Sequence, residues 1–229
     1  MKRSLIFIII LLFCGNSFAQ QITERKNTIT VHVTEQFQTV TENGKIIKSG
    51  IYHAFYRKKV IASGMYKNDK RVGTWLFYDP NGVLLQNFDY ATNKITYEAP
   101  ENAISRMRYI VDYQIGATDT VIQPVKLGGR YFGYLPYLKI LRSMEELEDV
   151  DMAHCGVTVK FLISPYGRLA DCSVHIECAG TAPAVLNINT DLLTEDDKLF
   201  APATFNKKLV ASQIEISCYR NDEGKIEIY

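Results

Sequence analysis

The chain has 229 residues, and 47% of them are apolar, which is ordinary for a globular protein and unlike a disordered chain. Its 26 lysines and arginines almost balance 25 aspartates and glutamates, so it lacks the basic excess with which proteins bind nucleic acid. A chain of this length folds as one or two domains. We therefore expect a globular protein whose partners are not nucleic acids.

The N-terminus has the pattern of a cleaved secretory signal peptide over residues 1–19. A short basic start precedes the apolar run 5–13, and residues 17–19 read Ser-Phe-Ala, with small residues where a signal peptidase cuts. The apolar run is too short for a helix that spans a bilayer, which needs about 20 residues. We therefore predict a mature chain that begins at Gln20 and a periplasmic protein.

Two alternatives remain for this segment. In a lipoprotein, Cys14 would carry the lipid, although Phe13 stands before it where that class prefers a small residue. If the segment is not cleaved, it serves as a membrane anchor. No later segment of the sequence is long and apolar enough to cross a membrane.

Four of the 5 cysteines lie in the last third of the chain: Cys155, Cys172, Cys178 and Cys218. Export makes disulfides available to them. Four cysteines allow two bridges in three pairings, and spacing alone does not select one. The alternative is that these small side chains fill an apolar core.

Residues 41–90 repeat one short pattern, a glycine followed two positions later by an aromatic residue. It occurs as Gly50-x-Tyr52, Gly64-x-Tyr66 and Gly73-x-Trp75, and Tyr78 takes the place that Phe55 has in the first unit. Turn signals lie between the expected strands, at Asn43-Gly44, Asn68-Asp69-Lys70 and Asn81-Gly82, and Asn-Gly favours tight β-hairpins. We therefore predict a row of hairpins whose aromatic side chains stack from one unit onto the next, with glycines giving clearance to the neighbouring backbone.

This pattern resembles the bacterial variant of the MORN repeat, G-x-W/Y-x-x-Y-x-x-N-G-x-x, over residues 41–90. The resemblance implies a small curved antiparallel sheet within residues 20–98 that acts as a scaffold or contact surface. Members of that family contact lipid or protein, so the repeat does not define a ligand. We expect its aromatic residues to form a stacking core, with a ligand platform as the alternative.

Residues 99–127 give weaker signals, and we interpret them as a connecting segment. Residues 106–115 could add one strand, whereas Pro124 argues against a central strand around it. A turn is expected at Gly128-Gly129, where the second half of the chain begins.

The second half predicts two helices. Apolar residues at helical spacing and a proline suited to a first turn predict a helix over residues 136–147. A second helix is expected over residues 191–200, with Asp191 as its N-cap and leucines as its apolar contacts.

Residues 155–178 read as an antiparallel β-hairpin. Apolar residues alternate on both sides of a Ser-Pro-Tyr-Gly turn: Val157, Val159, Phe161 and Ile163 before it, and Ala170, Cys172, Val174, Ile176 and Cys178 after it. If Ile163 faces Arg168 across the turn, Cys155 faces Ile176 and lies diagonal to Cys178. That register brings Cys155 and Cys178 within reach of a disulfide. A closing strand has Val210, Ile214, Ile216 and Cys218 on its inner face.

Residues 128–222 are similar to the C-terminal domain of TonB. The shared elements are the amphipathic helix, Val157-x-Val159-x-Phe161-x-Ile163 with Gly167 and Val174, Phe200-x-Pro202-Ala203, and Asn206-Lys207-Lys208-x-Val210 before the last strand. Phe200 stands where tryptophan is frequent, and Lys207 stands where glycine is usual, which puts the geometry of that turn in doubt. The resemblance implies an α+β domain, a three-stranded antiparallel sheet with helices on one face, followed by a tail over residues 223–229.

The same resemblance implies a way of binding partners. In TonB proteins the edge of the last strand pairs with an extended segment of an outer-membrane transporter, which is β-augmentation. The outward residues here would be Gln213, Glu215, Ser217 and Tyr219. The expected partner is an outer-membrane transporter or another envelope protein. An exposed edge also invites pairing between two copies of the chain.

One departure weakens the comparison with an energy transducer. The chain has only 7 prolines and so lacks a long proline-rich spacer, and its apolar start looks cleavable. We therefore expect a periplasmic binding protein that keeps the binding fold, with a link to outer-membrane transport as what the resemblance implies. The alternatives are an envelope scaffold whose repeats contact lipid or cell wall, and a short membrane-anchored transducer.

The sequence gives no pattern of an active site. Cys172, His175 and Cys178 suggest a metal site, but on a strand the histidine faces away from the two cysteines. The hydrolase, zinc-protease and phosphate-loop motifs are absent from the sequence. The acidic run over residues 145–151 fits a solvated helix end. We expect neither an enzyme nor a cofactor or metal.

Overall fold

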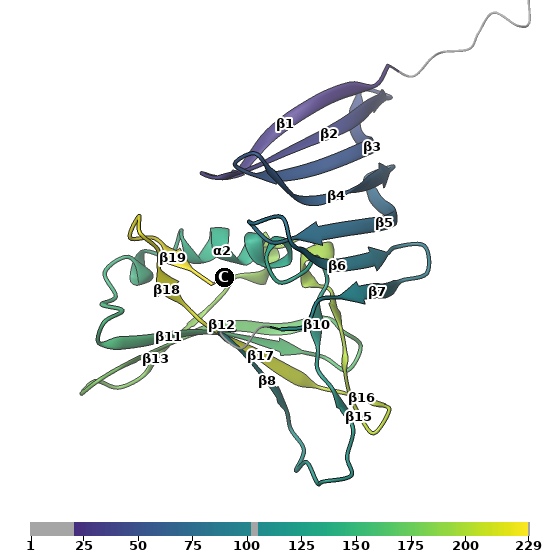
Figure 1. Ribbon diagram of the computed structural model, residues 1–229. Coiled ribbons are helices and arrows are strands. Elements are labelled where there is room, and N and C mark those ends of the chain that lie inside the picture. The colour runs from purple at the N-terminus through teal and green to yellow at the C-terminus, as the bar shows by residue number, and fades with distance from the viewer. Residues whose placement is uncertain (1–20, 102–104, 229) are drawn as a thin grey trace, which may run out of the picture.

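The computed structural model describes residues 21–101 and 105–228. It consists mostly of antiparallel β-sheet with few helical residues. Figure 1 shows a seven-stranded sheet from the first half of the chain next to a second layer, in which helix α2 lies over a five-stranded sheet. The coarse prediction of an α+β chain with an N-terminal row of hairpins is therefore confirmed.

The seven-stranded sheet is a meander in which each strand pairs with the next along the chain. Its strands are β1 (Thr23–Thr30), β2 (Val33–Glu42), β3 (Lys45–Tyr56), β4 (Lys59–Lys67), β5 (Lys70–Tyr78), β6 (Leu84–Asp89) and β7 (Lys94–Glu98). The expected turn at Asn43-Gly44 forms with φ of 51° and 77°, the left-handed values that a two-residue hairpin turn requires. The sheet also extends beyond the repeated sequence, because β1 and β7 pair onto its two sides.

The repeat aromatics lie on the buried face of this sheet, with Trp75 at their centre. Trp75 is fully buried, and its ring lies 5.1 Å from that of Tyr52 and 5.2 Å from that of Tyr66. The indole lies directly over Gly64, where an added Cβ would come within 2.3 Å of the ring. The repeat glycine thus makes room for the aromatic residue of the next strand.

Tyr78 does not follow the predicted pattern. Phe77 is the residue that stacks on Trp75, at 6.0 Å, because residues two apart on a strand share one face. Phe77 is 1% exposed, whereas Tyr78 is only half-buried. Tyr52, Tyr66 and Trp75 form the expected cluster, and Phe77 completes it in place of Tyr78.

The five-stranded sheet has the order β13-β12-β11-β17-β8. These strands are β8 (Met107–Val111), β11 (Cys155–Ile163), β12 (Leu169–Cys178), β13 (Ala184–Asn187) and β17 (Ser212–Ser217). The predicted hairpin and closing strand correspond to its three central strands, and most of their predicted inner residues are buried. Ala170 is exposed, Cys178 is half-buried and Val210 precedes β17, so for these three residues the prediction is wrong in detail. The expected sheet of three strands is too small, because β8 and β13 each add one strand at an edge.

Short strands complete the second layer. A two-stranded piece joins β10 (Val125–Lys126) to β14 (Phe200–Ala201), and a three-stranded piece joins β16 (Lys208–Val210), β15 (Ala203–Phe205) and β9 (Val121–Ile122). Asn206 and Lys207 form the turn between β15 and β16 with φ of 49° and 67°. The turn therefore keeps its left-handed geometry although lysine replaces the usual glycine.

The helices are shorter than predicted. Helix α2 spans Leu135–Leu141, between the 3₁₀ turns η1 (Phe132–Tyr134) and η2 (Glu145–Leu147). It ends where the Ser143 hydroxyl donates to the Ile140 carbonyl and Met144 becomes extended, with ψ of 111°.

The second predicted helix does not form. Residues 191–200 contain parts of the 3₁₀ turns η3 (Thr190–Leu192) and η4 (Asp196–Lys198), and Asn189, not Asp191, is the N-cap. Asp197 accepts bonds from both the backbone N–H and the hydroxyl of Thr194, at 3.0 and 2.7 Å. This local bonding competes with a continuous helix.

The predicted tail is part of the fold. Strand β19 (Ile226–Glu227) pairs with β18 (Tyr219–Arg220), and the side chains of Ile226 and Ile228 are 4% and 3% exposed. In the sequence, the alternation of Ile226 and Ile228 around Glu227 indicated a short strand. The prediction of a tail over residues 223–229 is therefore wrong for its described residues.

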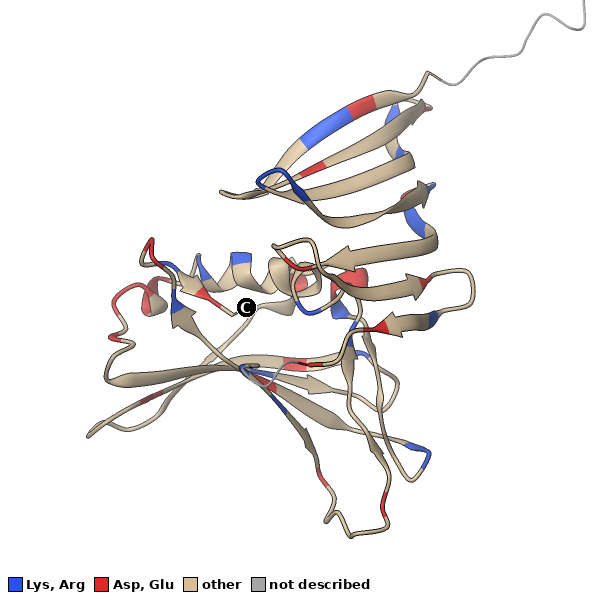
Figure 2. Cartoon of the chain, in the orientation of Figure 1, with Lys and Arg blue, Asp and Glu red and all other residues tan. Residues whose placement is uncertain are grey.

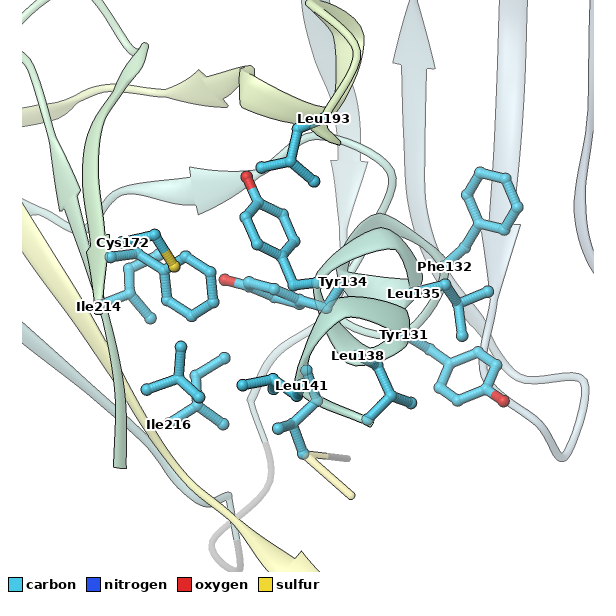
Figure 3. Close-up of a cluster of buried hydrophobic side chains, with 14 of the residues drawn as sticks. Tyr131, Phe132, Tyr134, Leu135, Leu138, Leu141, Cys172, Leu193, Ile214 and Ile216 are labelled. Atoms are coloured by element: carbon cyan, nitrogen blue, oxygen red, sulfur yellow. The ribbon is translucent and has the colours of Figure 1, made fainter. Parts of the chain in front are cut away.

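The two sheets share one hydrophobic core through η1 and α2. Phe132 lies 5.7 Å from Phe77 on the repeat side, while Tyr137 lies 4.9 Å from Phe161 on the other side. Figure 3 shows Tyr131 and Phe132 pointing away from Tyr134, which points toward Cys172 and Ile214. One short helical segment thus joins what the sequence presented as two units.

Gln86 fixes the connection between the sheets. Its side chain is fully buried and donates to Glu98 at 2.8 Å and to the Lys126 carbonyl at 3.0 Å. Its oxygen accepts from the backbone N–H groups of Gly128 and Gly129, at 2.9 and 3.1 Å. Every donor and acceptor of this amide is therefore used.

We expect Gln86→Leu to lower the free energy of unfolding by about 3 kcal/mol, because it leaves buried partners without hydrogen bonds. Urea unfolding of the variant measures this loss. The matched control is Gln114→Leu at an exposed position, which should change little. Equal losses in the two variants would show that Gln86 does not connect the sheets.

Candidate binding edge and inter-sheet pocket

The predicted binding edge on the closing strand is occupied by the chain itself. Strand β17 pairs with β11 on one side and with β8 on the other, where Gln213 lies opposite Ile110. Residues 106–115 were expected to add at most one strand. That strand is β8, and it pairs with β17. The prediction that Gln213, Glu215 and Ser217 line a free edge is therefore wrong.

Glu215 holds β8 in place. It is 7% exposed and accepts from Nε of Arg108 at 2.8 Å, while Nζ of Lys160 lies 3.5 Å away. Burial acts to raise the pKa of Glu215, but the hydrogen bond and charge of Arg108, with Lys160, outweigh it and hold the pKa below its ordinary value. These charges cross three strands and stabilise an internal contact.

The other predicted edge residues also make internal contacts. The backbone N–H of Ser217 donates to the Arg106 carbonyl at 3.1 Å. Tyr219 belongs to β18, and the Arg106 guanidinium lies 4.5 Å from its ring centre. Gln213 donates to Glu215 at 2.6 Å. None of these four side chains therefore forms part of an open strand edge.

The outer edges of the two sheets differ in charge. Strands β1 and β7 flank the seven-stranded sheet and carry acidic and basic residues, which Figure 2 shows along β1. Strand β8 carries Arg108. Strand β13 reads Ala-Val-Leu-Asn and carries no charge. Charged side chains on an edge hinder pairing with another chain, so β13 is the least protected of these edges.

The backbone of β13 presents hydrogen-bonding groups outward. The N–H of Ile188 donates to the Cys172 carbonyl at 2.9 Å, which sets the alternation along the strand. Leu186 therefore directs its backbone groups toward β12, and Val185 and Asn187 direct theirs away from it. The Val185 side chain is 54% exposed. The edge can accept a further antiparallel or parallel strand.

A disulfide closes the end of the hairpin next to β13. Cys155 and Cys178 are bonded, as predicted, with Cα atoms 4.1 Å apart. They lie directly opposite each other, not diagonally, because Ile163 pairs with Leu169 in place of Arg168 and an irregularity between Leu162 and Ile163 shifts the register by one more residue. Cys178 is the last residue of β12, so the bridge anchors the start of the loop that leads from β12 to β13.

The other cysteines and the histidines of the described segments form no reactive cluster. Cys172 and Cys218 are buried free thiols, and burial raises the pKa of Cys218 to about 12. In residues 21–101 and 105–228 no three His, Cys, Asp or Glu residues come together in a way that could hold a metal ion.

A pocket of about 510 Å³ lies between the seven-stranded sheet and the second layer. Tyr52 and Tyr66 of the repeats line it, so two of the predicted repeat aromatics reach a cavity as well as the core. Lys126, Arg71 and the acidic turn η4 also line it. Sequence reasoning missed this site, although a lysine between Val125 and Leu127 in an apolar run was a signal.

No family model, curated protein or solved structure matched this chain. Among the helices of the described segments, none is long and apolar enough to span a membrane.

Proposed function

We propose that this chain is an exported, non-enzymatic binding protein that recognises an extended protein segment by β-augmentation at β13. The partner would be an outer-membrane transporter or another envelope protein, and the protein would act in the periplasm. The signal-like N-terminus and the resemblances to MORN repeats and to the TonB C-terminal domain support this proposal. The observation that carries it is the open, uncharged edge of β13.

The expected contact is short and depends on the backbone. Strand β13 has four residues, Ala184–Asn187, so the added strand pairs over a few residues only. Main-chain bonds to Val185 and Asn187 would supply affinity, and side-chain neighbours would supply selectivity. Val185 lies opposite His175. A side chain of the added strand next to Val185 would therefore meet one apolar and one polar neighbour. Because β8 already occupies the edge of β17, binding is assigned to the opposite side of the sheet.

Val185→Pro tests this proposal. Proline removes an outward N–H while the bonds of Leu186 to β12 remain, so capture of partners from a periplasmic extract should fall by at least about tenfold. Val185→Thr keeps the N–H and is the matched control, which should retain capture. With partner added, hydrogen exchange at Val185 and Asn187 should slow. Unchanged capture by a folded Val185→Pro protein would contradict binding at this edge.

A scaffold function is the second candidate, and an apolar pair on the outer face of the repeats favours it. Ile51 and Met65 are cross-strand neighbours and are 49% and 52% exposed. This face would contact lipid or cell wall. Sedimentation with lipid vesicles or with isolated cell wall tests it, and loss of binding in Ile51→Lys would support it.

The third candidate, a short membrane-anchored transducer, depends on residues 1–20, which lie outside the described residues. Mass spectrometry of the mature protein decides between cleavage and anchoring. A mature chain that begins at Gln20 would exclude the anchor.

A further inference from the structure

The inter-sheet pocket places positive charge at its floor. Lys126 is 3% exposed, and its Nζ donates to the carbonyls of Leu127 and Leu199, at 3.2 and 2.9 Å. Both partners are neutral, although a buried ammonium group is normally paired with a carboxylate. The ammonium group therefore lies in the pocket with no acidic side chain within hydrogen-bonding distance in the described part of the chain.

Arg71 adds a second cation beside Lys126. Its side chain is 13% exposed and donates to the hydroxyls of Tyr66 and Tyr90, at 3.3 and 3.0 Å. The carboxylate of Asp196 lies 3.7 Å from Nε, beyond a good hydrogen bond. Within the described residues no hydrogen bond uses Nη2 of Arg71. The guanidinium thus keeps donors for a further acceptor.

The rim of the pocket is acidic. Asp196 and Glu195 are much more exposed than the two cations, with side-chain exposures of 45% and 72%. Asp69 and Asp197 also line the opening. Glu195 pairs with Arg168 and Lys198, whereas Asp197 accepts from neutral groups of Thr194. Asp196 and Asp197 are the carboxylates whose charge acts on Lys126. Charge therefore changes sign from the buried floor to the exposed rim.

The walls between floor and rim are aromatic. Tyr52, Tyr66 and Phe132 line the pocket, and Lys48 lies 5.2 Å from the centre of the Tyr66 ring while it pairs with Glu35 at 3.7 Å. Aromatic faces accept both apolar groups and cations. The volume of about 510 Å³ suits a small ligand.

We propose that this pocket binds a small zwitterion, a free amino acid or a short peptide, with its carboxylate at Arg71 and Lys126 and its ammonium group at Asp196 and Asp197. A guanidinium is suited to a carboxylate because its donors match the two oxygens. No residue of β13 lines the pocket, so this binding is separate from the proposed recognition at that edge.

The pocket makes the binding depend on pH. Burial, with the charge of Arg71, lowers the pKa of Lys126 to about 7, although Asp197 and Asp196 act to raise it. Glu98 is linked to the same segment through Gln86, whose Nε2 donates both to Glu98 and to the Lys126 carbonyl. A bound carboxylate favours the ammonium form of Lys126, so binding takes up a proton. Affinity should fall from about pH 6 to about pH 9.

Isothermal titration calorimetry with four probes tests the proposal. Glycine and triglycine carry both charges, N-acetyltriglycine lacks the ammonium group, and triglycinamide lacks the carboxylate. We expect binding of the unblocked probes and a loss of about tenfold or more when either end is blocked. Stronger binding of glycine indicates a free amino acid as the ligand, and stronger binding of triglycine indicates a short peptide.

Two variants show which side chains bind the carboxylate and the ammonium group of the ligand. Lys126→Met should weaken triglycine by about tenfold and remove the proton uptake, and Asp196→Asn should weaken triglycine but not N-acetyltriglycine. Lys207→Met, on an exposed turn, is the control and should bind as the unchanged protein does. Asp196 is exposed enough that its variant should fold even if Lys126→Met does not. Equal binding of blocked and unblocked probes, or no binding of any probe, would overturn the proposal.

Discussion

Gly64→Ala is expected to lower the free energy of unfolding by about 3 kcal/mol, a large loss for the addition of one methyl group. The new Cβ would lie 2.3 Å from the Trp75 ring, and that ring is fully buried. The indole cannot move aside, because it packs against Tyr52 and Tyr66 and donates from Nε1 to the Met65 carbonyl at 3.2 Å. Denaturant unfolding followed by circular dichroism measures the loss.

Two further variants show whether the Trp75 ring causes that loss. Gly156→Ala is the matched control in a strand, since its Cβ would meet its nearest neighbour, the Glu177 carbonyl, at 3.9 Å. It should be close to neutral. In a Trp75→Leu background the same Gly64→Ala change should cost much less, because the clashing ring is gone. A loss of equal size in both backgrounds would exclude the steric explanation.

The second large effect concerns pH and Lys126. Burial lowers the pKa of Lys126 from 10.5 to about 7, so between these values the unfolded chain binds a proton that the folded protein lacks. Stability should therefore rise with pH in this window, by about 2 kcal/mol from about pH 7 to about pH 9. We expect Lys126→Met to remove this rise, because methionine fills a similar volume without a titrating group.

Urea unfolding of both proteins at several pH values measures the difference. Lys207→Met is the control and should keep the rise, since Lys207 is exposed. Measurements should stop below about pH 10, because burial raises the pKa of Tyr137 and Tyr109 and their titration lowers stability above that pH. Parallel curves for Lys126→Met and the unchanged protein would show that Lys126 does not control this dependence.

The features that were predictable from the sequence depend on neighbours along the chain. Asn43-Gly44 can form a tight turn with little strain, and the glycine-aromatic spacing places Trp75 over Gly64. The Cys155–Cys178 contact followed from the alternation of one hairpin. Its register was two residues wrong, because Ile163 pairs with Leu169 at the turn and nothing local marked the irregularity between Leu162 and Ile163.

The features that were missed depend on segments far apart in the chain. Met107–Val111 read as a strand, but its pairing with β17 depends on contacts such as Arg108 with Glu215, which no local pattern reveals. The pocket likewise joins Arg71, Lys126 and Asp196 from three separate segments. Helix lengths were overestimated because side-chain bonds such as that of Asp197 to Thr194 compete with the helix.

The shared core has a consequence for how the protein loses its structure. Since Phe132 packs on Phe77 while Tyr137 packs on Phe161, neither layer can open without exposing aromatic surface that belongs to the other. We therefore expect unfolding to be cooperative over the whole described chain, as in a single domain, despite the change of sequence character near residue 98. We expect a fragment cut in the 99–127 segment to expose the aromatic surface that the other layer covers, and therefore to aggregate.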